Sequence, residues 1–271
     1  MPELPEVETT RRRLLPHVVG RRIRDVVVRN GALRWPVPRE LPRRLRGERV
    51  EAIRRRGKYL LFDCAHGHLL VHLGMSGRLT LVAADAPART HDHVDLKLEG
   101  DKVLRLTDPR RFGAMLWLPQ PAEGHVLLSG LGLEPLERAF TGSALHKAAK
   151  GRRLAVKQFL MDGRVVTGVG NIYASEALFR AGVHPVRGVD RIARASWDRI
   201  ARAVKETLNH ALEEGGTTLR DFASPDGRAG GYQHKRMVYG RDGEACSVCG
   251  RRIRCLRQGQ RSTFYCPGCQ K

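Results

Sequence analysis

The sequence Cys246-Ser-Val-Cys249, followed after sixteen residues by Cys266-Pro-Gly-Cys269, decides how the C-terminal part of the chain folds. A Cys-x-x-Cys pair makes a tight turn that points both sulfurs into one space. Two such pairs supply the four tetrahedral ligands that zinc prefers. The intervening residues are enough for a hairpin that returns the second pair to the first. We expect one Zn²⁺ ion with a structural role, because no coordination position stays open for catalysis. The alternative is two redox or disulfide pairs.

The distribution of the cysteines supports a metal site. Five of the six fall in the last 26 residues, whereas a secreted disulfide framework would distribute its pairs along the chain. Cys64 and Cys255 have no ligand spacing to a partner, and we expect both to be ordinary thiols.

Positive charge dominates the composition. Lys and Arg number 49 against 28 Asp and Glu, a formal net charge of +21, which phosphates or anionic lipids would neutralise. A basic protein with no particular partner is the alternative. Some arginines of the predicted hairpin could balance the negative charge of four thiolates on zinc. Five exceed that need and favour phosphate contact, namely Arg251, Arg252, Arg254, Arg257 and Arg261.

The composition also excludes some classes of protein. Apolar residues make up 41% of the chain, enough to form a core, so it is not a disordered tail. Charged residues interrupt the long apolar stretches, and we expect no segment that spans a membrane. The start Met1-Pro-Glu-Leu-Pro-Glu6 is acidic and lacks the basic and apolar parts of a signal peptide. We therefore expect a soluble cytoplasmic protein.

The pattern along the chain changes from strands to helices. Between about residues 20 and 118, short apolar runs alternate with turn signals, which indicates an antiparallel sandwich or barrel. Residues 119–140 are rich in Pro and Gly and are interpreted as a connection. Residues 215–240 are Gly-rich and predict a long loop. Helices are predicted at residues 144–150, 155–161, 172–181 and 195–214.

The first residues predict a reactive amine at the start of a helix. Pro2 becomes a secondary amine if Met1 is removed, and an α-amino group has a pKa near ~8. A helix that begins at about Pro5 would place its positive end beside this amine and lower its pKa further. Such an amine can form a Schiff base, and Glu3 could move protons beside it. A well-capped helix with solvated acids is the alternative.

Two loop motifs suggest contacts with an anion and with a base stack. In Thr167-Gly-Val-Gly-Asn171 we interpret Asn171 as a helix N-cap and the glycines as exposing backbone N–H groups to a phosphate. A Gly-x-Gly turn between packed helices is the alternative. Thr107-Asp-Pro-Arg-Arg-Phe112, together with Met75, could supply a wedge for stacked bases. A simple turn followed by a core Phe is the alternative.

These motifs occur together and in order along the chain. They are Met1-Pro-Glu-Leu-Pro-Glu-Val-Glu8, Arg56-Gly-Lys-Tyr-Leu60, His72-Leu-Gly-Met-Ser-Gly77, Asp108-Pro-Arg-Arg-Phe-Gly113, Gly168-Val-Gly-Asn-Ile-Tyr173 and the four-cysteine finger. In this combination the chain resembles the bacterial formamidopyrimidine-DNA glycosylases over essentially its whole length.

The resemblance implies an α+β fold, with an N-terminal antiparallel β-sandwich, a helical helix–two-turn–helix domain and a C-terminal zinc-finger hairpin. The expected domains are residues 1–120, a linker at 121–140, residues 141–235 and residues 236–271. The implied activity is that of a monomeric, bifunctional DNA glycosylase and abasic-site lyase of base-excision repair. Its partner would be double-stranded DNA that contains oxidised purines or abasic sites, at the bacterial nucleoid and not at a membrane.

The resemblance also implies residue roles. Pro2 would attack the sugar C1′ as nucleophile, and Glu3 would donate a proton. Lys58 would be the proton donor for β-elimination, and Arg261 would take part in δ-elimination. The loop Thr217–Tyr232 would close over a flipped base. The implied phosphate clamp is Lys58, His72, Asn171 and Arg261. The implied DNA contacts are His91, Arg110 and Arg152, and Met75, Arg110 and Phe112 would fill the gap in the helix. The implied zinc ligands are Cys246, Cys249, Cys266 and Cys269.

Two alternatives and two departures accompany this interpretation. A glycosylase of the endonuclease VIII type, which removes oxidised pyrimidines, shares the Pro-Glu start and the finger. A non-enzymatic zinc-finger DNA-binding protein would explain the charge and the finger, but not Pro2, Glu3 or Lys58. Lys157-Gln-Phe159 stands where Lys-Pro-Trp is more usual. Residues Gly231–Met237 also differ from the family pattern in length and composition.

Overall fold

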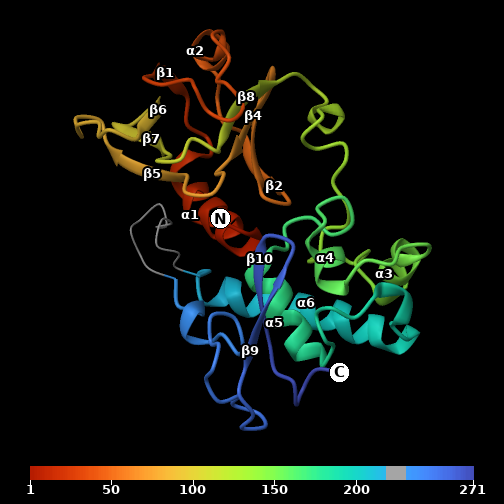
Figure 1. Cartoon of the computed structure of the whole chain (residues 1–271). Coiled ribbons are helices and arrows are strands. Elements are labelled where there is room, and N and C mark those ends of the chain that lie inside the picture. Colours follow the sequence, from red (N-terminus) through yellow and green to blue (C-terminus); the bar gives the residue numbers. More distant parts are fainter. Residues whose placement is uncertain (218–229) are drawn as a thin grey trace. The chain divides into compact units, whose positions relative to one another are not determined.

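The chain folds into two units, and most of their helices and strands are labelled in Figure 1. This computed structural model describes residues 1–217 and 230–271. Unit 1 comprises Met1–Ser129 and Gly215–Gly231, and unit 2 comprises Gly130–Glu214 and Tyr232–Lys271. In the described part of the chain, none of the helices has the length and apolar character needed to cross a membrane.

Unit 1 consists of two antiparallel four-stranded sheets and two helices. One sheet has the strand order β1-β6-β7-β5 and the other has the order β2-β3-β4-β8. The strands predicted between residues 20 and 118 are thereby confirmed. The elements are α1 (Leu4–Val18), β1 (Ile23–Val28), α2 (Leu41–Leu45), β2 (Ala52–Arg56), β3 (Tyr59–Cys64), β4 (Gly67–His72), β5 (Arg78–Ala83), β6 (Asp92–Leu98), β7 (Lys102–Thr107), β8 (Ala114–Leu118) and a 3₁₀ turn (Ala122–Gly124).

The two sheets share one apolar core with both helices, as expected of a β-sandwich. Strand β6 shows why: successive side chains of a strand point to opposite faces, so Val94, Leu96 and Leu98 all face the core. The turn Gly100-Asp101 joins β6 to β7 in a hairpin, and both turn residues have positive φ, 88° and 57°. This backbone matches the tight turns that suit twisted strands.

Helix α1 is fixed to the second sheet by a buried charge cluster. The Glu8 carboxylate accepts hydrogen bonds from Arg11, Arg12 and Arg55, at 2.8 to 3.2 Å. Arg55 belongs to β2, and Arg11 also donates to the Ile53 carbonyl of that strand at 3.1 Å. Burial raises the pKa of Glu8, but the hydrogen bonds from Arg11 and Arg12 outweigh it and hold the pKa at about 2. The arginine-rich start of the sequence therefore binds the helix to the sheet.

Unit 2 contains the predicted helices and a C-terminal hairpin. The helices begin and end within two residues of the predicted bounds. Trp197 of α6 is fully buried and meets Phe159 of α4 edge to face, with ring centroids 5.4 Å apart. The elements are α3 (Gly142–Ala149), α4 (Val156–Met161), α5 (Asn171–Ala181), a 3₁₀ turn (Val189–Arg191), α6 (Arg194–Glu213), a 3₁₀ turn (Tyr232–His234), β9 (Arg254–Gln258) and β10 (Arg261–Tyr265).

The Glu8 cluster predicts a specific pH dependence of stability. Because the folded pKa of about 2 lies below the ordinary value of 4.5, Glu8 stabilises the fold above pH 4.5. This contribution is lost as the pH falls towards 2. We expect Glu8→Gln to lower the free energy of unfolding at pH 7 by about 1–2 kcal/mol, a value discounted for solvent screening. Urea titrations from pH 7 to pH 3 would measure it.

The difference in free energy of unfolding between Glu8→Gln and the wild type should decrease steadily below about pH 4.5. The exposed Glu40 offers a matched control, because Glu40→Gln should change stability little at any of these pH values. A destabilisation by Glu8→Gln that stays constant from pH 7 to pH 3 would contradict this assignment.

Candidate functional site

The sulfurs of four cysteines converge in unit 2. The Sγ atoms of Cys246, Cys249, Cys266 and Cys269 all lie within 4.8 Å of one another. Two separations are 3.4 Å, for Cys249 and Cys266, and 3.8 Å, for Cys246 and Cys269. A tetrahedron with Zn–S distances of ~2.3 Å has edges of ~3.8 Å. The four thiols therefore fit one structural zinc ion, and the predicted metal site is confirmed.

The other two cysteines stay outside this cluster. Cys64 is buried in β3, and burial raises the pKa of its thiol to about 12. It therefore stays protonated and unreactive near neutral pH. Cys255 is exposed on β9. None of the six cysteines, all of which lie in the described ranges, forms a disulfide.

The zinc site is fixed to the end of α5. Phe179 packs against Ile253 and Cys266 in a small core. The buried Gln270 donates to the Val183 carbonyl at 2.9 Å and accepts from the Cys266 backbone N–H at 2.8 Å. The finger is therefore held to the helical unit by backbone groups as well as by its core. The five arginines predicted to form a basic surface on the hairpin are all exposed.

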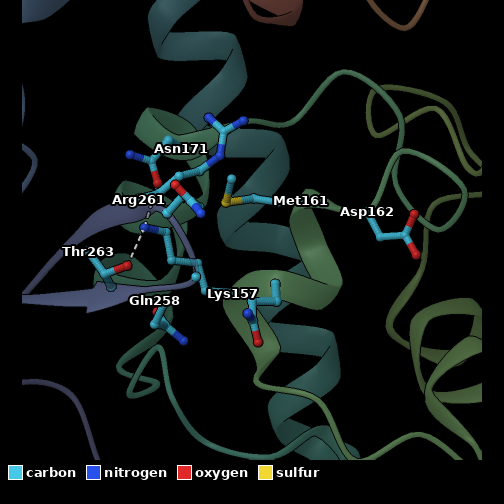
Figure 2. A pocket seen from close by; sticks show the side chains of 10 residues that line it. Lys157, Met161, Asp162, Asn171, Gln258, Arg261 and Thr263 are labelled. Carbon is cyan, nitrogen blue, oxygen red and sulfur yellow. Dashed lines mark hydrogen bonds between the residues drawn. The ribbon is translucent and has the colours of Figure 1, made fainter.

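A buried lysine joins α4, α5 and the hairpin. Lys157 is only 1% exposed, and its Nζ donates to Asn171 Oδ1 and Thr263 Oγ1, both at 2.7 Å, and to the Ser262 carbonyl at 3.2 Å. Figure 2 shows this amine between Asn171 and Thr263. An ammonium group has three N–H donors, and these contacts match that number. This role of Lys157 could not be predicted from the sequence, because a charged residue in a short helix is ordinarily solvated.

The predicted capping role of Asn171 is wrong. The N-cap of α5 is Gly170, and Asn171 is the first helical residue. Its side-chain oxygen is held by Lys157, and its amide donates to the Ser262 carbonyl at 3.1 Å and to the Tyr239 hydroxyl at 3.3 Å. These tertiary partners outcompete the local capping bond. The glycine-bearing loop does lie between two helices, as expected, and the positive end of α5 begins at Asn171.

Asn171 and Arg261 line one pocket of about 450 Å³ in unit 2. The exposed Arg261 guanidinium extends into it beside Asn171 and Met161 (Figure 2). Arg152 is placed near its rim, because it pairs with the lining residue Asp162 at 3.6 Å. An exposed guanidinium beside a helix N-terminus is suited to bind a phosphate oxygen.

A second buried charge orders the segment that leads into the finger. The carboxylate of Glu176 on α5 accepts three backbone N–H bonds, from Met237, Val238 and Tyr239, at 2.7 to 3.0 Å. Burial raises the pKa of Glu176, although these N–H groups oppose the rise. No pattern in the sequence indicates this role, since Glu176 falls in an ordinary helical pattern. Tyr239 then contacts both Asn171 and Phe264 of the hairpin.

In unit 1, Asp108 joins the two loops that carry the proposed gap-filling residues. Its carboxylate accepts the Ser76 hydroxyl at 2.9 Å and the Gly113 backbone N–H at 2.8 Å. Ser76 in turn accepts the Arg110 backbone N–H at 3.2 Å. Met75 and Phe112, which flank this network in sequence, are 37% and 40% exposed. The loop that carries Met75 is therefore joined to the loop that carries Arg110 and Phe112.

Glycine is required where these two loops touch. Gly74 has a φ of +60°, and a Cβ there would lie 2.5 Å from the Phe112 carbonyl carbon. On the other side of Phe112, the Arg110 guanidinium carbon lies 4.8 Å from the ring centroid. His91 joins the same assembly through its backbone carbonyl, which accepts the Asp108 N–H at 3.0 Å, and its side chain is exposed.

Lys58 and His72 are placed together by the pairing of β3 with β4. Tyr59, next to Lys58, is the register partner of His72, and their rings lie 4.8 Å apart. Burial, Lys58 and Arg34 together lower the pKa of His72 to about 4. The backbone N–H of Gly74 donates to His72 Nδ1 at 3.2 Å. His72 is therefore neutral near pH 7 with its proton on Nε2, where it can donate to an anion.

The start of α1 is ordered by a third buried carboxylate. Pro2 is buried and Glu3 is 3% exposed. The Glu6 carboxylate accepts the Glu3 backbone N–H and also the Thr217 backbone N–H, each at 2.8 Å. Thr217 pairs with Gly231 in an antiparallel bridge. Glu6 therefore joins the predicted nucleophile segment to the neck of the predicted lesion loop. The loop itself, residues 218–229, lies outside the described residues.

The Glu8 cluster extends this arrangement to Lys58. Arg55, held by Glu8, also donates to the Gly57 carbonyl at 3.1 Å, directly before Lys58. Glu8 lies five positions after Glu3, roughly 7.5 Å along a helix. Unit 1 therefore contains the predicted site residues Pro2, Glu3, Lys58, His72 and His91, and the proposed gap-filling residues Met75, Arg110 and Phe112. Unit 2 gathers Arg152, Asn171, Arg261 and the zinc ligands.

Comparison with known proteins gives consistent matches over the whole chain. Residues 1–115 match the formamidopyrimidine-DNA glycosylase N-terminal domain, and residues 131–223 match the H2TH domain of the same enzymes. Residues 243–271 match a zinc finger found in FPG and IleRS. Formamidopyrimidine-DNA glycosylase of Methylococcus capsulatus is 55% identical over 271 residues, which is 100% of both chains.

Solved structures agree with these matches. The MutM (Fpg) protein of Thermus thermophilus superposes with a TM-score of 0.89 at 40% identity, covering 99% of this chain and 98% of that one. Lactococcus lactis Fpg bound to DNA with an abasic site gives a TM-score of 0.92 at 32% identity, covering 99% of each chain. The same Lactococcus protein has also been solved with DNA containing Fapy-dG and with DNA containing an oxidised pyrimidine.

The zinc geometry predicts that Cys249→Ser loses the metal while Cys255→Ser keeps it. The first substitution removes one of four ligands, and the second lies outside the cluster. Because zinc binding contributes to folding, residues 243–271 should also become sensitive to protease in Cys249→Ser. Zinc content per chain and limited proteolysis would measure both effects. Stoichiometric zinc in a protease-resistant Cys249→Ser protein would show that this thiol is not a ligand.

Proposed function

The chain belongs to the formamidopyrimidine-DNA glycosylase family, and on that premise we propose that it excises oxidised purines from double-stranded DNA. The substrates are chiefly 8-oxoguanine and formamidopyrimidines, and the enzyme then cleaves the strand by β,δ-elimination. The observation that carries this proposal is the arrangement of buried carboxylates on α1. Glu6 and Glu8 tie the Pro2-Glu3 start to the loop neck at Thr217 and to the turn before Lys58.

The nucleophile is the secondary amine of Pro2, which requires removal of Met1. The neutral amine attacks C1′ of the damaged nucleotide, the bond to the base breaks, and the sugar opens to a Schiff base with Pro2. Glu3 supplies the proton that opens the sugar ring and supports departure of the base. Burial of Pro2 and the positive end of α1 both favour the uncharged amine, which is the reactive form.

Strand cleavage and DNA binding use the remaining cations. Lys58 donates the proton for β-elimination and Arg261 takes part in δ-elimination. Lys58, His72, Asn171 and Arg261 hold the phosphates around the lesion, and neutral His72 does so through Nε2–H. The zinc ion does no chemistry; it stiffens the hairpin that presents Arg261.

The gap-filling residues stabilise DNA from which a nucleotide has been flipped out. Flipping costs a few kcal/mol, and side chains that replace the lost stacking offset part of that cost. Met75 and Phe112 supply apolar surface and Arg110 supplies hydrogen-bond donors, with His91 and Arg152 as further DNA contacts. We place the enzyme in the bacterial cytoplasm at the nucleoid, acting as a monomer.

Borohydride trapping tests the Schiff-base chemistry. We expect the protein to be trapped covalently on DNA that contains 8-oxoguanine, because borohydride reduces the Schiff base to a stable amine. Pro2→Gly should reduce trapping strongly, since it replaces the secondary amine and its ring. Gel analysis of the trapped complex measures the yield, with undamaged DNA as the control.

The same assay separates the two glycosylase activities. More efficient trapping on thymine glycol than on 8-oxoguanine would favour an enzyme for oxidised pyrimidines, a possibility raised by the Lactococcus complex with such DNA. Absence of trapping on both 8-oxoguanine and abasic-site DNA would refute the proposed mechanism.

Salt dependence tests the phosphate contacts. Each neutralised phosphate contributes a slope of about −0.9 to the plot of log affinity against log salt. Arg261→Ala should therefore make the slope less negative by about one, whereas Arg39→Ala, at an exposed position outside the proposed site, should leave it unchanged. Fluorescence anisotropy with an abasic-site duplex at several salt concentrations measures both. Equal slopes for wild type and Arg261→Ala would remove Arg261 from the clamp.

A further inference from the structure

A small pocket of unit 1 is lined by aromatic rings and an arginine that the proposed chemistry does not use. Its volume is about 290 Å³. We call it the aromatic pocket, and its lining residues are Arg34, Trp35, Tyr59, His72, Phe112, Ala114 and Leu127. Four of these seven side chains are planar rings. The proposed roles of His72 and Phe112 leave Trp35, Tyr59 and Arg34 without an assigned function.

Trp35 is unusual because it is a large ring that the fold leaves uncovered. Its exposure is 38%, close to the 40% of Phe112, whereas Trp197 is fully buried. Its nearest ring partner is His125, with centroids 6.4 Å apart in an edge-to-face arrangement. An exposed tryptophan that faces a pocket is a surface on which another flat ring can stack.

The aromatic pocket is tied to the gap-filling loop by backbone contacts. The N–H of Arg34 donates to the Arg111 carbonyl at 2.8 Å, and Trp35 pairs with Ala114 in a parallel bridge. These contacts join the Arg34-Trp35 segment to residues that precede and follow Phe112 in the sequence. The Arg110 guanidinium carbon lies 4.8 Å from the centroid of the Phe112 ring, and Phe112 also lines the pocket.

The size and charge of the aromatic pocket select the class of ligand. Ligand pockets range from about 300 to 1,000 Å³, so this one lies at the low end and accepts a single flat ring system. Arg34 and Lys58 act electrostatically on His72, and Arg34 also acts on Tyr59, which makes the surroundings positive. Aromatic rings in a positive setting are the combination by which proteins bind unstacked bases of nucleic acids.

We propose that the aromatic pocket binds one nucleobase that is not stacked in a duplex, with Trp35 as the main stacking surface. Arg34 and His72 both line the pocket, and their N–H donors would bind the phosphate attached to that base. The base comes either from DNA opened beside the lesion or from a free nucleotide. The first source rests on the proposed function, because Phe112 disturbs the base stack only if the protein acts on damaged duplex DNA.

The first experiment uses a free nucleotide. Titration with dAMP should quench the tryptophan fluorescence to saturation, because Trp35 is exposed at the pocket. Deoxyribose 5-phosphate, which lacks a base, should not quench it. Leu127→Phe keeps every tryptophan but fills the pocket, so quenching should be lost in this variant, and circular dichroism would confirm that it folds.

The second experiment uses 2-aminopurine placed in turn at each position flanking an abasic-site analogue, on both strands. One position should be quenched by the wild-type protein and not by Trp35→Leu. Stacking of one base contributes ~1–3 kcal/mol, so Trp35→Leu should weaken binding of this duplex by about 5-fold to 150-fold. Trp35→Phe is the matched control, because it keeps a stacking ring and should retain most of the affinity.

The two experiments distinguish the sources of the base. A response to dAMP alone assigns the aromatic pocket to free nucleotides, and a response at one DNA position assigns it to the opened duplex. Absence of a response in both experiments overturns the proposal. Borohydride trapping depends on Pro2 and not on the aromatic pocket. If trapping fails, quenching by dAMP still supports the pocket proposal. If trapping succeeds but neither pocket experiment responds, the pocket proposal alone is overturned.

Discussion

Buried charges that bind backbone groups organise the loops on which the functional side chains lie. Loop backbone has no strand or helix partner, and a buried N–H without a hydrogen bond is costly. Asp108 supplies an acceptor to Gly113, Glu6 supplies acceptors to Glu3 and Thr217, and Glu176 supplies acceptors to the segment before the finger. Lys157 instead supplies hydrogen-bond donors to oxygen atoms of the C-terminal hairpin. Each loop is therefore held by one charged side chain, which belongs to a helix for Glu6, Glu176 and Lys157 and directly follows β7 for Asp108.

These buried charges lower the stability of the fold, but they fix the positions of the loops. Removing a carboxylate from water is unfavourable, and the raised pKa of Glu176 reflects that cost even with three N–H partners. An apolar side chain of similar size would fill the same space more cheaply, but it could not fix the direction of a backbone N–H. The elements themselves are held by ordinary means, namely the shared core of the two sheets and the packing of Trp197 in unit 2.

Sequence patterns predicted the features that depend on spacing and periodicity. Two Cys-x-x-Cys pairs predicted the zinc site, and apolar periodicity predicted the strands of unit 1 and the helices of unit 2. The exceptions depend on distant partners. Asn171 has the side chain of an N-cap, yet Lys157 holds its oxygen. Lys157 and Glu176 look like solvated helix residues, because only the fold brings their partners to them. Their roles could not be deduced from neighbouring residues.

The hydrogen bonds by which Asp108 joins two loops have a mechanical consequence. A side chain that separates stacked bases experiences a restoring force from the DNA, and a compliant support would yield before the bases part. Ser76 and Gly113, bound to one carboxylate, couple two loops at the ends of different strands, so a load on Phe112 is shared by both sheets. The close contact of Gly74 with the Phe112 backbone leaves the Phe112 loop little room to move. If Phe112 enters the base stack as proposed, the rigidity of the two loops would set, together with the shape of the Phe112 ring, how far the double helix can be opened.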